Sequence, residues 1–187
     1  MTSKTLAVCK MCKNTVVIKG YLYICNNSSC NSIYWNKSLF SLLAEGKKFY
    51  NLVYDEKKKK NKKVLTSDYK KILDDANIKK PKFGENFIYQ IKLKKGNQET
   101  YLKKLIQKDE KNIKKSFYEY YVGKTTLHPL ERYLRHIIGY QSGKKIAHKY
   151  QIALVYYEGP MISDDATHRE EELADQLRLN GYTVYQN

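Results

Sequence analysis

Residues 120–124 read Tyr-Tyr-Val-Gly-Lys, and they join a predicted β-strand at 117–122 to a predicted α-helix at 125–136. Pro129 in the first turn of this helix and Gly139 just past its end are typical helix boundary residues, because proline fits the first turn and glycine tolerates the left-handed end. The segment therefore predicts a strand, a tight turn at a glycine, and a helix that follows directly.

Two further strands and another helix are predicted around this unit. Residues 87–93 alternate between apolar and polar side chains, which indicates a strand, and residues 151–156 form a third one. Residues 167–179 predict the last helix, and residues 181–185 an edge strand or tail. We expect these strands and helices to form an α+β domain.

Arg132 and His136 lie one turn apart in the 125–136 helix, so their side chains share one face of it. A guanidinium can bind a phosphate through two hydrogen bonds and neutralise charge that builds up on it. An imidazole can hydrogen-bond a phosphate oxygen or the attacking group. These two residues therefore indicate phosphodiester chemistry, and an unused surface pair on a basic helix is the alternative.

Three consecutive glutamates, residues 170–172, lie in the last predicted helix. Its apolar positions lie three, four and seven residues after the first glutamate: Leu173, Ala174 and Leu177. By helical periodicity, Glu170 lies on the inward edge of the helix and the other two glutamates face solvent. An acidic first turn that complements the helix dipole is the alternative interpretation of the cluster.

Tyr89 and Tyr121 lie in two of the predicted strands, and we expect those strands to be neighbours. A tyrosine with its usual pKa near about 10 is a poor base at neutral pH unless nearby cations lower that pKa. We expect Lys124 and Arg132 to lower it here. Ordinary packing of both rings is the alternative, since the chain has 18 tyrosines.

Over residues 85–187 the chain resembles the GIY-YIG nuclease superfamily. Residues 87–89, Phe-Ile-Tyr, correspond to the first signature triplet, and residues 121–123, Tyr-Val-Gly, correspond to the second. The lysine, arginine, histidine and glutamate described above follow in the order that the family has. The first triplet departs from the family, because Phe87 replaces its glycine.

The position of a family asparagine also departs from the pattern. The family often has this asparagine about twelve residues after its glutamate, and Tyr182 stands there in this chain. Asn180 or Asn187 takes the role, or the role is absent.

The resemblance implies a small, mixed or antiparallel, three-stranded sheet flanked by helices, with residues 98–115 as an insertion. It also implies that one divalent metal ion, Mg²⁺, binds Glu170 and assists hydrolysis of a phosphodiester to 5′-phosphate and 3′-hydroxyl ends. The residues to which the resemblance assigns catalysis are Tyr89, Tyr121, Lys124, Arg132, His136 and Glu170.

Among nucleases of this kind, a compact chain with its own DNA-binding attachments is most similar to a type II restriction endonuclease. The resemblance thus implies a sequence-specific enzyme for double-stranded DNA that acts as a homodimer, because a palindromic target mirrors a two-fold axis. A homing or mobile-element nuclease, a repair nuclease, and a non-catalytic zinc-containing nucleic-acid-binding protein are the alternatives.

Four cysteines lie within residues 1–48, which we predict to be an N-terminal module: Cys9, Cys12, Cys25 and Cys30. Two close pairs on either side of a short β-like stretch are typical of a structural Zn²⁺ site with four thiolate ligands. Metal binding would then supply most of the folding energy of so short a segment. Two disulfides are the alternative, which suits a secreted protein.

Residues 49–84 are predicted to be a basic linker or insertion with one short helix, which Thr66 caps and which stops near Asn77. A lysine-rich run precedes that helix and cannot be a packed element, so we expect a solvated loop or hairpin tip that would contact phosphates without reading sequence. Its lysines are Lys57, Lys58, Lys59, Lys60, Lys62 and Lys63.

The whole chain is strongly basic, with 35 Lys+Arg against 19 Asp+Glu in 187 residues and a formal net charge of +16. This charge favours a polyanionic partner, and a lysine-rich surface without such a partner is the alternative. No apolar run is long enough to span a membrane and no signal-peptide core is present, so we expect a soluble, cytoplasmic protein with no membrane partner.

Overall fold

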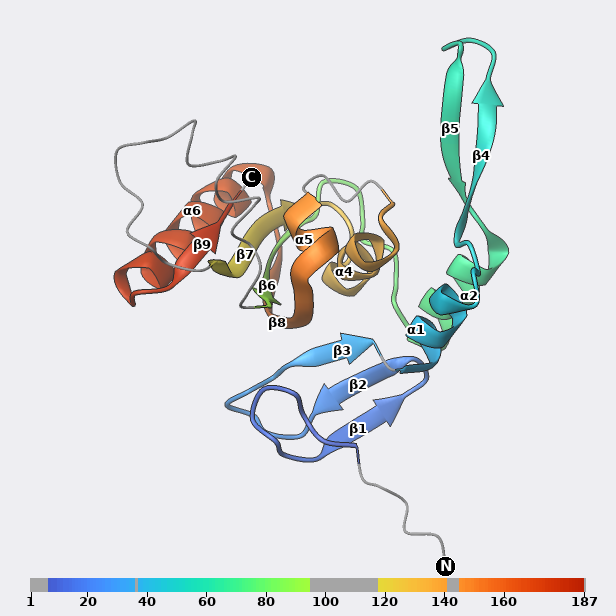
Figure 1. The fold of residues 1–187 in the computed structure, drawn as a ribbon. Helices are drawn as coiled ribbons and strands as arrows, with labels where there is room; N and C mark the ends of the chain where they lie inside the picture. The colour runs from blue at the N-terminus through green and yellow to red at the C-terminus, as the bar shows by residue number, and fades with distance from the viewer. Residues whose placement is uncertain (1–6, 36, 95–117, 141–144, 187) are drawn as a thin grey trace, which may run out of the picture.

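The computed structural model describes residues 7–35, 37–94, 118–140 and 145–186. These residues form an α+β fold around one seven-stranded sheet, and only the β7–β9 pair among the described strands is parallel (Figure 1). In spatial order the strands are β1 (Val16–Lys19), β2 (Leu22–Cys25), β3 (Ile33–Trp35), β8 (Gln151–Met161), β6 (Asn86–Leu93), β7 (Tyr118–Thr125) and β9 (Thr183–Tyr185).

The sheet is larger than the three strands expected from the sequence, which correspond to β8, β6 and β7. On one side β3 pairs with β8 through Ile33 and Leu154, so the strands of the cysteine-containing segment continue the same sheet. On the other side β9 adds to β7. Both additions pair backbone groups that would otherwise be unpaired along the edges of β8 and β7.

The strand β7 is also longer than predicted. Gly123 pairs with Tyr89 inside the β6–β7 ladder, and β7 runs on to Thr125. The prediction of a tight turn at Gly123 is therefore wrong. The helix α4 (Pro129–Ile138) starts later than predicted, at the proline whose fixed backbone suits a first helical turn.

The helix boundaries follow from capping groups. The backbone N–H of Leu130 donates to His128 Nδ1 at 3.2 Å at the start of α4, and Gly139 ends the helix with a φ of 69°. The last helix, α6 (Ser163–Leu179), begins four residues earlier than predicted, with Asp164 and Asp165 in a first turn where carboxylates are stabilised by the helix dipole.

The sheet separates two apolar cores, because neighbouring residues of a strand point to opposite faces. Ile88 and Val122 pack with Leu173 and Ala174 of α6. The alternate residues, which include Tyr89 and Tyr121, join the larger core that contains side chains of α4 and of α5 (Lys145–Tyr150), a helix that the sequence reasoning missed. Period-two alternation thus directs the two tyrosines towards α4.

Outside the sheet, the two-stranded hairpin β4 (Tyr50–Asp55) and β5 (Lys60–Leu65) projects from the molecule, with α1 (Lys37–Ala44) and α2 (Ser67–Asp75) at its base (Figure 1). The prediction of a lysine-rich hairpin tip is confirmed, although β5 contains half of the lysines. The capped helix is also confirmed, since the N–H of Tyr69 donates to Thr66 Oγ1 at 3.4 Å.

The expected insertion at residues 98–115 lies outside the described residues. Among the described helices, none combines the length and the apolar character needed to cross a membrane.

Candidate active site and cysteine cluster

The hydroxyl group of Tyr89 lies at the centre of the predicted site. Its oxygen lies 2.9 Å from His136 Nε2, and Arg132 Nε donates to it at 3.4 Å. Because the guanidinium can only donate, the phenol oxygen accepts from Arg132. In the hydrogen bond to His136, the imidazole tautomer determines which group donates. The shared helix face predicted for the arginine and the histidine is confirmed, since both side chains reach one atom of β6.

His136 is fully buried, and its Nδ1 has no hydrogen-bond partner among the described residues. Burial, with smaller contributions from Arg132 and His148, lowers the pKa of His136 to about 3. The imidazole is therefore neutral at neutral pH. The helix segment that carries it is held from behind, where His148 Nδ1 donates to the carbonyl oxygen of His136 at 2.6 Å.

Tyr121 packs beside this pair. Its ring centroid lies 5.9 Å from that of Tyr89 and 5.5 Å from that of His136, and it stacks on Tyr185 of β9 at 6.0 Å. The rings of Tyr89, Tyr121 and His136 form one contact group with Arg132. No residue of this group was expected to contact the C-terminal strand, which only the sheet order reveals.

The expectation that cations lower the pKa values of these tyrosines is wrong for the protein by itself. Burial raises the pKa of Tyr89, even though Arg132 acts in the opposite direction. Burial also raises the pKa of Tyr121, and the neighbouring Tyr89 adds to this effect. A phenol with its usual pKa near about 10 is already protonated at neutral pH. Burial moves the pKa values of both tyrosines further up, because an enclosed anion loses more hydration than one guanidinium restores.

The absence of a side chain at Gly123 makes room for this arrangement. A Cβ atom added there would lie 2.9 Å from Tyr89 Oη, 3.0 Å from Tyr89 Cζ and 3.1 Å from Tyr121 Cε1. Real Cβ contacts are longer, so any larger residue would displace the phenol that contacts His136. The glycine of the second triplet is thus required by the close approach of the two tyrosines.

Lys124 lies on the opposite face of β7 from the tyrosines. Its Nζ donates to Thr167 Oγ1 of α6 at 2.6 Å, which ties the strand to the last helix. Lys124 is not among the main groups that shift the pKa of Tyr89 or Tyr121. Its part in the site is to line an open pocket of about 420 Å³, together with Asn86, Thr125, Thr126, Leu127, Arg132 and Arg135.

Glu170 is 8% exposed, whereas Glu171 and Glu172 are exposed, so the direction predicted for the three glutamates is confirmed. The negative charge of Glu170 raises the pKa of Tyr89, and the positive charge of Arg132 lowers it. The carboxylate of α6 and the guanidinium of α4 therefore act on the same phenol.

The sequence did not indicate three residues at or behind the pocket: Arg135, which lines it, and Glu131 and Tyr69, which contact one another behind it. Arg135 Nη2 lies 2.7 Å from Glu131 Oε1, and the hydroxyl of Tyr69 donates to the same oxygen at 3.2 Å. This buried group joins α2 to α4. The Glu131–Arg135 spacing of four residues was a signal for an ion pair, but its burial under α2 depends on the tertiary fold.

Asn180 and Tyr182, considered for the family asparagine, both lie at the C-terminal end of α6. Asn180 is the exposed C-cap residue of that helix, and the ring of Tyr182 meets Tyr120 edge-on at 5.2 Å. Neither contacts the group around Tyr89 through any interaction described above. Asn187 lies outside the described residues.

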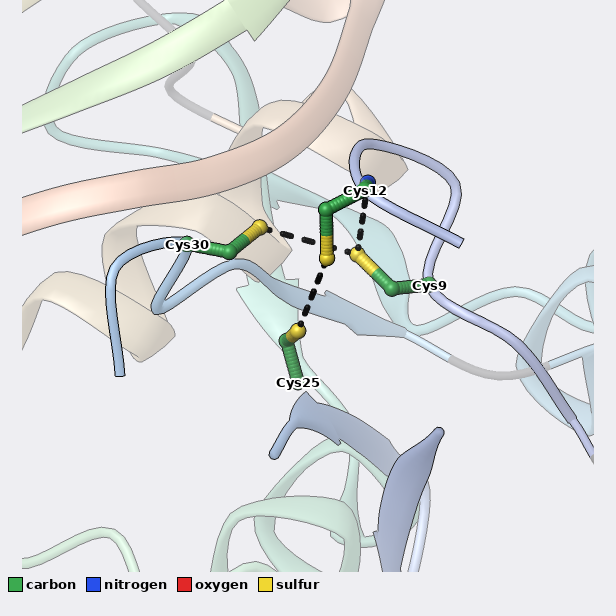
Figure 2. A group of neighbouring side chains, drawn as sticks. All are labelled: Cys9, Cys12, Cys25 and Cys30. Carbon is green, nitrogen blue, oxygen red and sulfur yellow. Dashed lines mark hydrogen bonds between the residues drawn. The ribbon is translucent and has the colours of Figure 1, made fainter. Parts of the chain in front are cut away.

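The four cysteines converge in space, and Figure 2 shows their sulfur atoms facing one another. Every sulfur lies within 4.8 Å of the others, and none forms a disulfide. Cys9 Sγ lies 3.7 Å from Cys30 Sγ, and Cys12 Sγ lies 3.5 Å from Cys25 Sγ. The clustering agrees with a four-thiolate metal site and not with the disulfide alternative.

Backbone and side-chain donors surround these sulfur atoms. The N–H groups of Met11 and Asn27 donate to Cys9 Sγ at 3.3 Å and to Cys25 Sγ at 3.4 Å. The side chain of Asn14 lowers the pKa of Cys12 to about 6, whereas burial raises that of Cys25 to about 12. Such donors stabilise thiolates, the form that binds metal, so the cluster can bind a structural metal ion such as zinc.

The lysines predicted to contact DNA do not all have free side chains. Lys57, Lys58, Lys59, Lys60 and Lys62 are exposed on the hairpin. Lys63 is partly buried, and its Nζ donates to the carbonyl oxygen of Gly139 at 3.1 Å. In this structure Lys63 has a structural contact at the hairpin base, and its phosphate-binding role stays a prediction.

Comparison of the chain with protein-family models, with curated proteins and with solved structures finds no match. Functional inference for this chain accordingly depends on the geometry and chemistry of the two sites described above.

Proposed function

We propose that the protein is a sequence-specific endonuclease for double-stranded DNA, of the type II restriction class and the GIY-YIG superfamily. The single observation that supports this most is the Tyr89 hydroxyl, held between Arg132 and His136 beside a basic pocket and under the influence of the Glu170 carboxylate. The net charge of +16 makes a polyanion the favoured substrate.

In this proposal the scissile phosphate binds in the pocket lined by Lys124, Arg132 and Arg135. The guanidinium of Arg132 compensates the charge that builds up on phosphorus, and the hydrogen bond from its Nε to Tyr89 fixes its orientation. Tyr89 and Tyr121 act as neutral hydrogen-bonding groups, since their pKa values are raised. Neutral His136 keeps the Tyr89 hydroxyl in place.

The reaction is a hydrolysis in which water forms a new bond to phosphorus and the bond to the 3′ oxygen breaks. The proton of the water leaves to solvent through the open pocket, and the 3′ oxygen takes up a proton, so the products are 5′-phosphate and 3′-hydroxyl ends. Glu170 would hold Mg²⁺, which would supply charge stabilisation at the departing oxygen. A single carboxylate suits this ion, which keeps several water ligands.

Each chain would cut one strand, so the proposal includes a homodimer on a palindromic DNA site. The four-cysteine cluster would hold Zn²⁺ as a structural ion that is closed to substrate, since all four tetrahedral positions are occupied by sulfur.

The test compares Glu170→Gln with Glu171→Gln, a neighbouring exposed residue of the same helix. Glu170→Gln should lower plasmid cleavage in Mg²⁺ by at least about 1000-fold, because loss of the metal removes several kcal/mol of charge stabilisation. Glu171→Gln should cut at the wild-type rate. Both variants should bind DNA as the wild type does.

Supercoiled plasmid, with and without added Mg²⁺, provides the measurement, and sequencing of the product ends reads specificity and symmetry together. Discrete fragments support restriction, and a smear supports non-specific cutting. Undiminished cutting by Glu170→Gln removes the metal assignment. If the wild-type protein binds DNA but does not cleave it, the result supports the alternative of a non-catalytic nucleic-acid-binding protein.

A further inference from the structure

The hairpin β4–β5 has two strands, and no other described strand or helix covers either face beyond its base. Its register runs from the pair Tyr50–Leu65 at the base to the pair Asp55–Lys60 at the tip, a length of about 20 Å. Leu52 is 63% exposed, Tyr54 55% and Val53 50%, so apolar side chains on both faces contact solvent. An isolated two-stranded ribbon gains little stability from its own packing, so it needs stabilising contacts at its base. A ribbon that projects in spite of this favours a binding role.

The base of the hairpin is fixed to the end of α4. Lys63 Nζ donates to the carbonyl oxygen of Gly139 at 3.1 Å, and the hydroxyl of Tyr140 donates to the carbonyl oxygen of Lys63 at 3.2 Å. The rings of Tyr50 and Tyr140 lie 5.7 Å apart, and Lys63 Nζ lies 4.4 Å from the Tyr50 ring centroid. The helix that presents Arg132 and His136 thus also holds the ribbon.

The two faces of the ribbon differ in composition. Residues 50, 52 and 54 share a face with residues 61, 63 and 65, because directly paired residues point to the same side. At the base this face carries the contacts to α4. Further out it presents the pair Tyr54–Asn61, one aromatic ring opposite one amide. The other face carries the pairs Val53–Lys62 and Asp55–Lys60.

Charge decides between possible occupants. Five exposed lysines surround the tip, and only two carboxylates accompany them, Asp55 and Glu56. The lysines are Lys57, Lys58, Lys59, Lys60 and Lys62. Two such ribbons from two copies of the chain would repel each other, whereas the phosphates of a nucleic acid are complementary to them.

A two-stranded β-ribbon fits the major groove of B-form DNA, whose base edges offer donors and acceptors to amide side chains. We infer that β4–β5 enters the major groove of the duplex, with Tyr54 and Asn61 towards the base edges and the five exposed lysines on the flanking phosphates. This inference deepens the proposed function and rests on it for the identity of the duplex as substrate.

The first experiment measures the phosphate contacts. The five exposed hairpin lysines are changed to glutamine, and the matched control changes five exposed lysines outside the hairpin: Lys70, Lys71, Lys79, Lys80 and Lys82. Both variants have the same net charge. Fluorescence anisotropy with a mixed-sequence duplex of about 30 base pairs, without Mg²⁺ and over a series of salt concentrations, gives affinity and salt dependence.

The hairpin variant should lose affinity at least about tenfold and should lose about 0.9 from the log–log salt slope for every phosphate contact removed. The control should keep most of the wild-type slope. Equal losses in the two variants overturn the inference, because net charge alone would then explain binding. Normal affinity in a hairpin variant that has changed its oligomeric state would assign the ribbon to an interface between copies.

The second experiment identifies the groove. Dimethyl sulfate methylates guanine N7 in the major groove and adenine N3 in the minor groove, and bound protein should protect the guanine positions. The double variant Tyr54→Ala/Asn61→Ala should lose that protection severalfold, whereas Asn51→Ala/Val53→Ala, on the other face, should keep it. Protection confined to adenine N3, or equal loss in both double variants, overturns the assignment.

The two proposals fail separately. A protein that binds duplex through the hairpin but never cleaves it contradicts the nuclease and leaves the ribbon inference standing. A protein that cleaves DNA normally in all of these hairpin variants contradicts the ribbon inference alone.

Discussion

At the scale of single residues, burial decides the chemistry of the site more than charge does. Tyr89, Tyr121 and His136 are all enclosed, and burial moves the pKa of each group further in favour of its neutral form. The Tyr89 hydroxyl accepts from Arg132 Nε and forms a second hydrogen bond with the neutral imidazole of His136. The site is therefore a preorganised hydrogen-bonded group whose charge comes from Arg132 and Glu170.

The buried imidazole predicts a pH dependence of stability. The pKa of His136 is lowered to about 3, below the usual value of about 6.5 in an unfolded chain. As pH falls through 6.5, about where the unfolded chain takes up the proton, the folded state still excludes it. The stabilising contribution is full above about pH 6.5 and decreases by up to about 1.4 kcal/mol for each pH unit below it, until the folded histidine titrates.

Chemical denaturation between about pH 4.5 and pH 7 measures this contribution for wild type, His136→Gln and His168→Gln. His168 is exposed, so its variant should follow the wild-type curve. His136→Gln should be less stable at neutral pH but should lose less stability on acidification. Parallel curves for wild type and His136→Gln would mean that the imidazole is not held neutral by burial.

At the scale of elements, α4 and its C-terminal end contact β6, the β4–β5 hairpin and α2. One face presents Arg132 and His136 to β6, the C-terminal end holds the hairpin, and Glu131 with Arg135 receives Tyr69 of α2. The ion pair is largely buried, with 11% and 14% of the two side chains exposed. Burial of this pair suggests that it fixes the orientation of α4 relative to α2.

Replacement of Glu131 by glutamine should lower the free energy of unfolding by about 3 kcal/mol, because Arg135 keeps its charge in a buried position without a carboxylate. Urea denaturation measures this change. The matched control is Glu171→Gln on the exposed face of α6, which should change stability by less than about 0.5 kcal/mol. The double variant Glu131→Gln/Arg135→Met should recover part of the loss, and a double variant as unstable as the single one contradicts the proposed pairing.

At the scale of the whole molecule, the cysteine cluster is connected through one sheet to the part that contains Tyr89 and Tyr121. The hydroxyl of Tyr34 in β3 contacts Cys9 Sγ, and Tyr34 packs in the same small core as Ala153 of β8. Strand β3 pairs with β8 through Ile33 and Leu154. Loss of metal should therefore affect an edge of the sheet as well as the cysteine-containing loops.

Replacement of Cys25 by serine tests this connection. Purified wild type should contain about one zinc ion for each chain, and the variant should contain far less, because only three thiolates remain. Its melting temperature should fall by at least about 5 °C. Ser29→Ala, at an exposed position between Cys25 and Cys30, should keep both the metal and the melting temperature. Elemental analysis with thermal denaturation provides both readings, and wild-type stability in a metal-free variant contradicts the structural role.

The sequence by itself determined the features that depend on neighbours along the chain. The cap at Thr66, the helix end at Gly139 and the inward side of α6 at Glu170 follow from local hydrogen bonding and helical periodicity, and the structure confirms them. The spacing of the cysteines determined their clustering for the same reason, since each close pair forms its own turn. The assignment of catalysis to these residues stays a prediction.

The tertiary structure alone decided the features that depend on distant segments. The extension of the sheet from β8 to β3, the role of Lys63 at Gly139 and the link from Tyr69 to Glu131 join residues far apart in the chain. The raised pKa of Tyr89 was also missed, because the sequence shows which cations are present but not how completely a phenol is buried. Burial results from the packing of the whole chain. It changes pKa values and determines which side chains form contacts, and the order of residues along the chain does not show either effect.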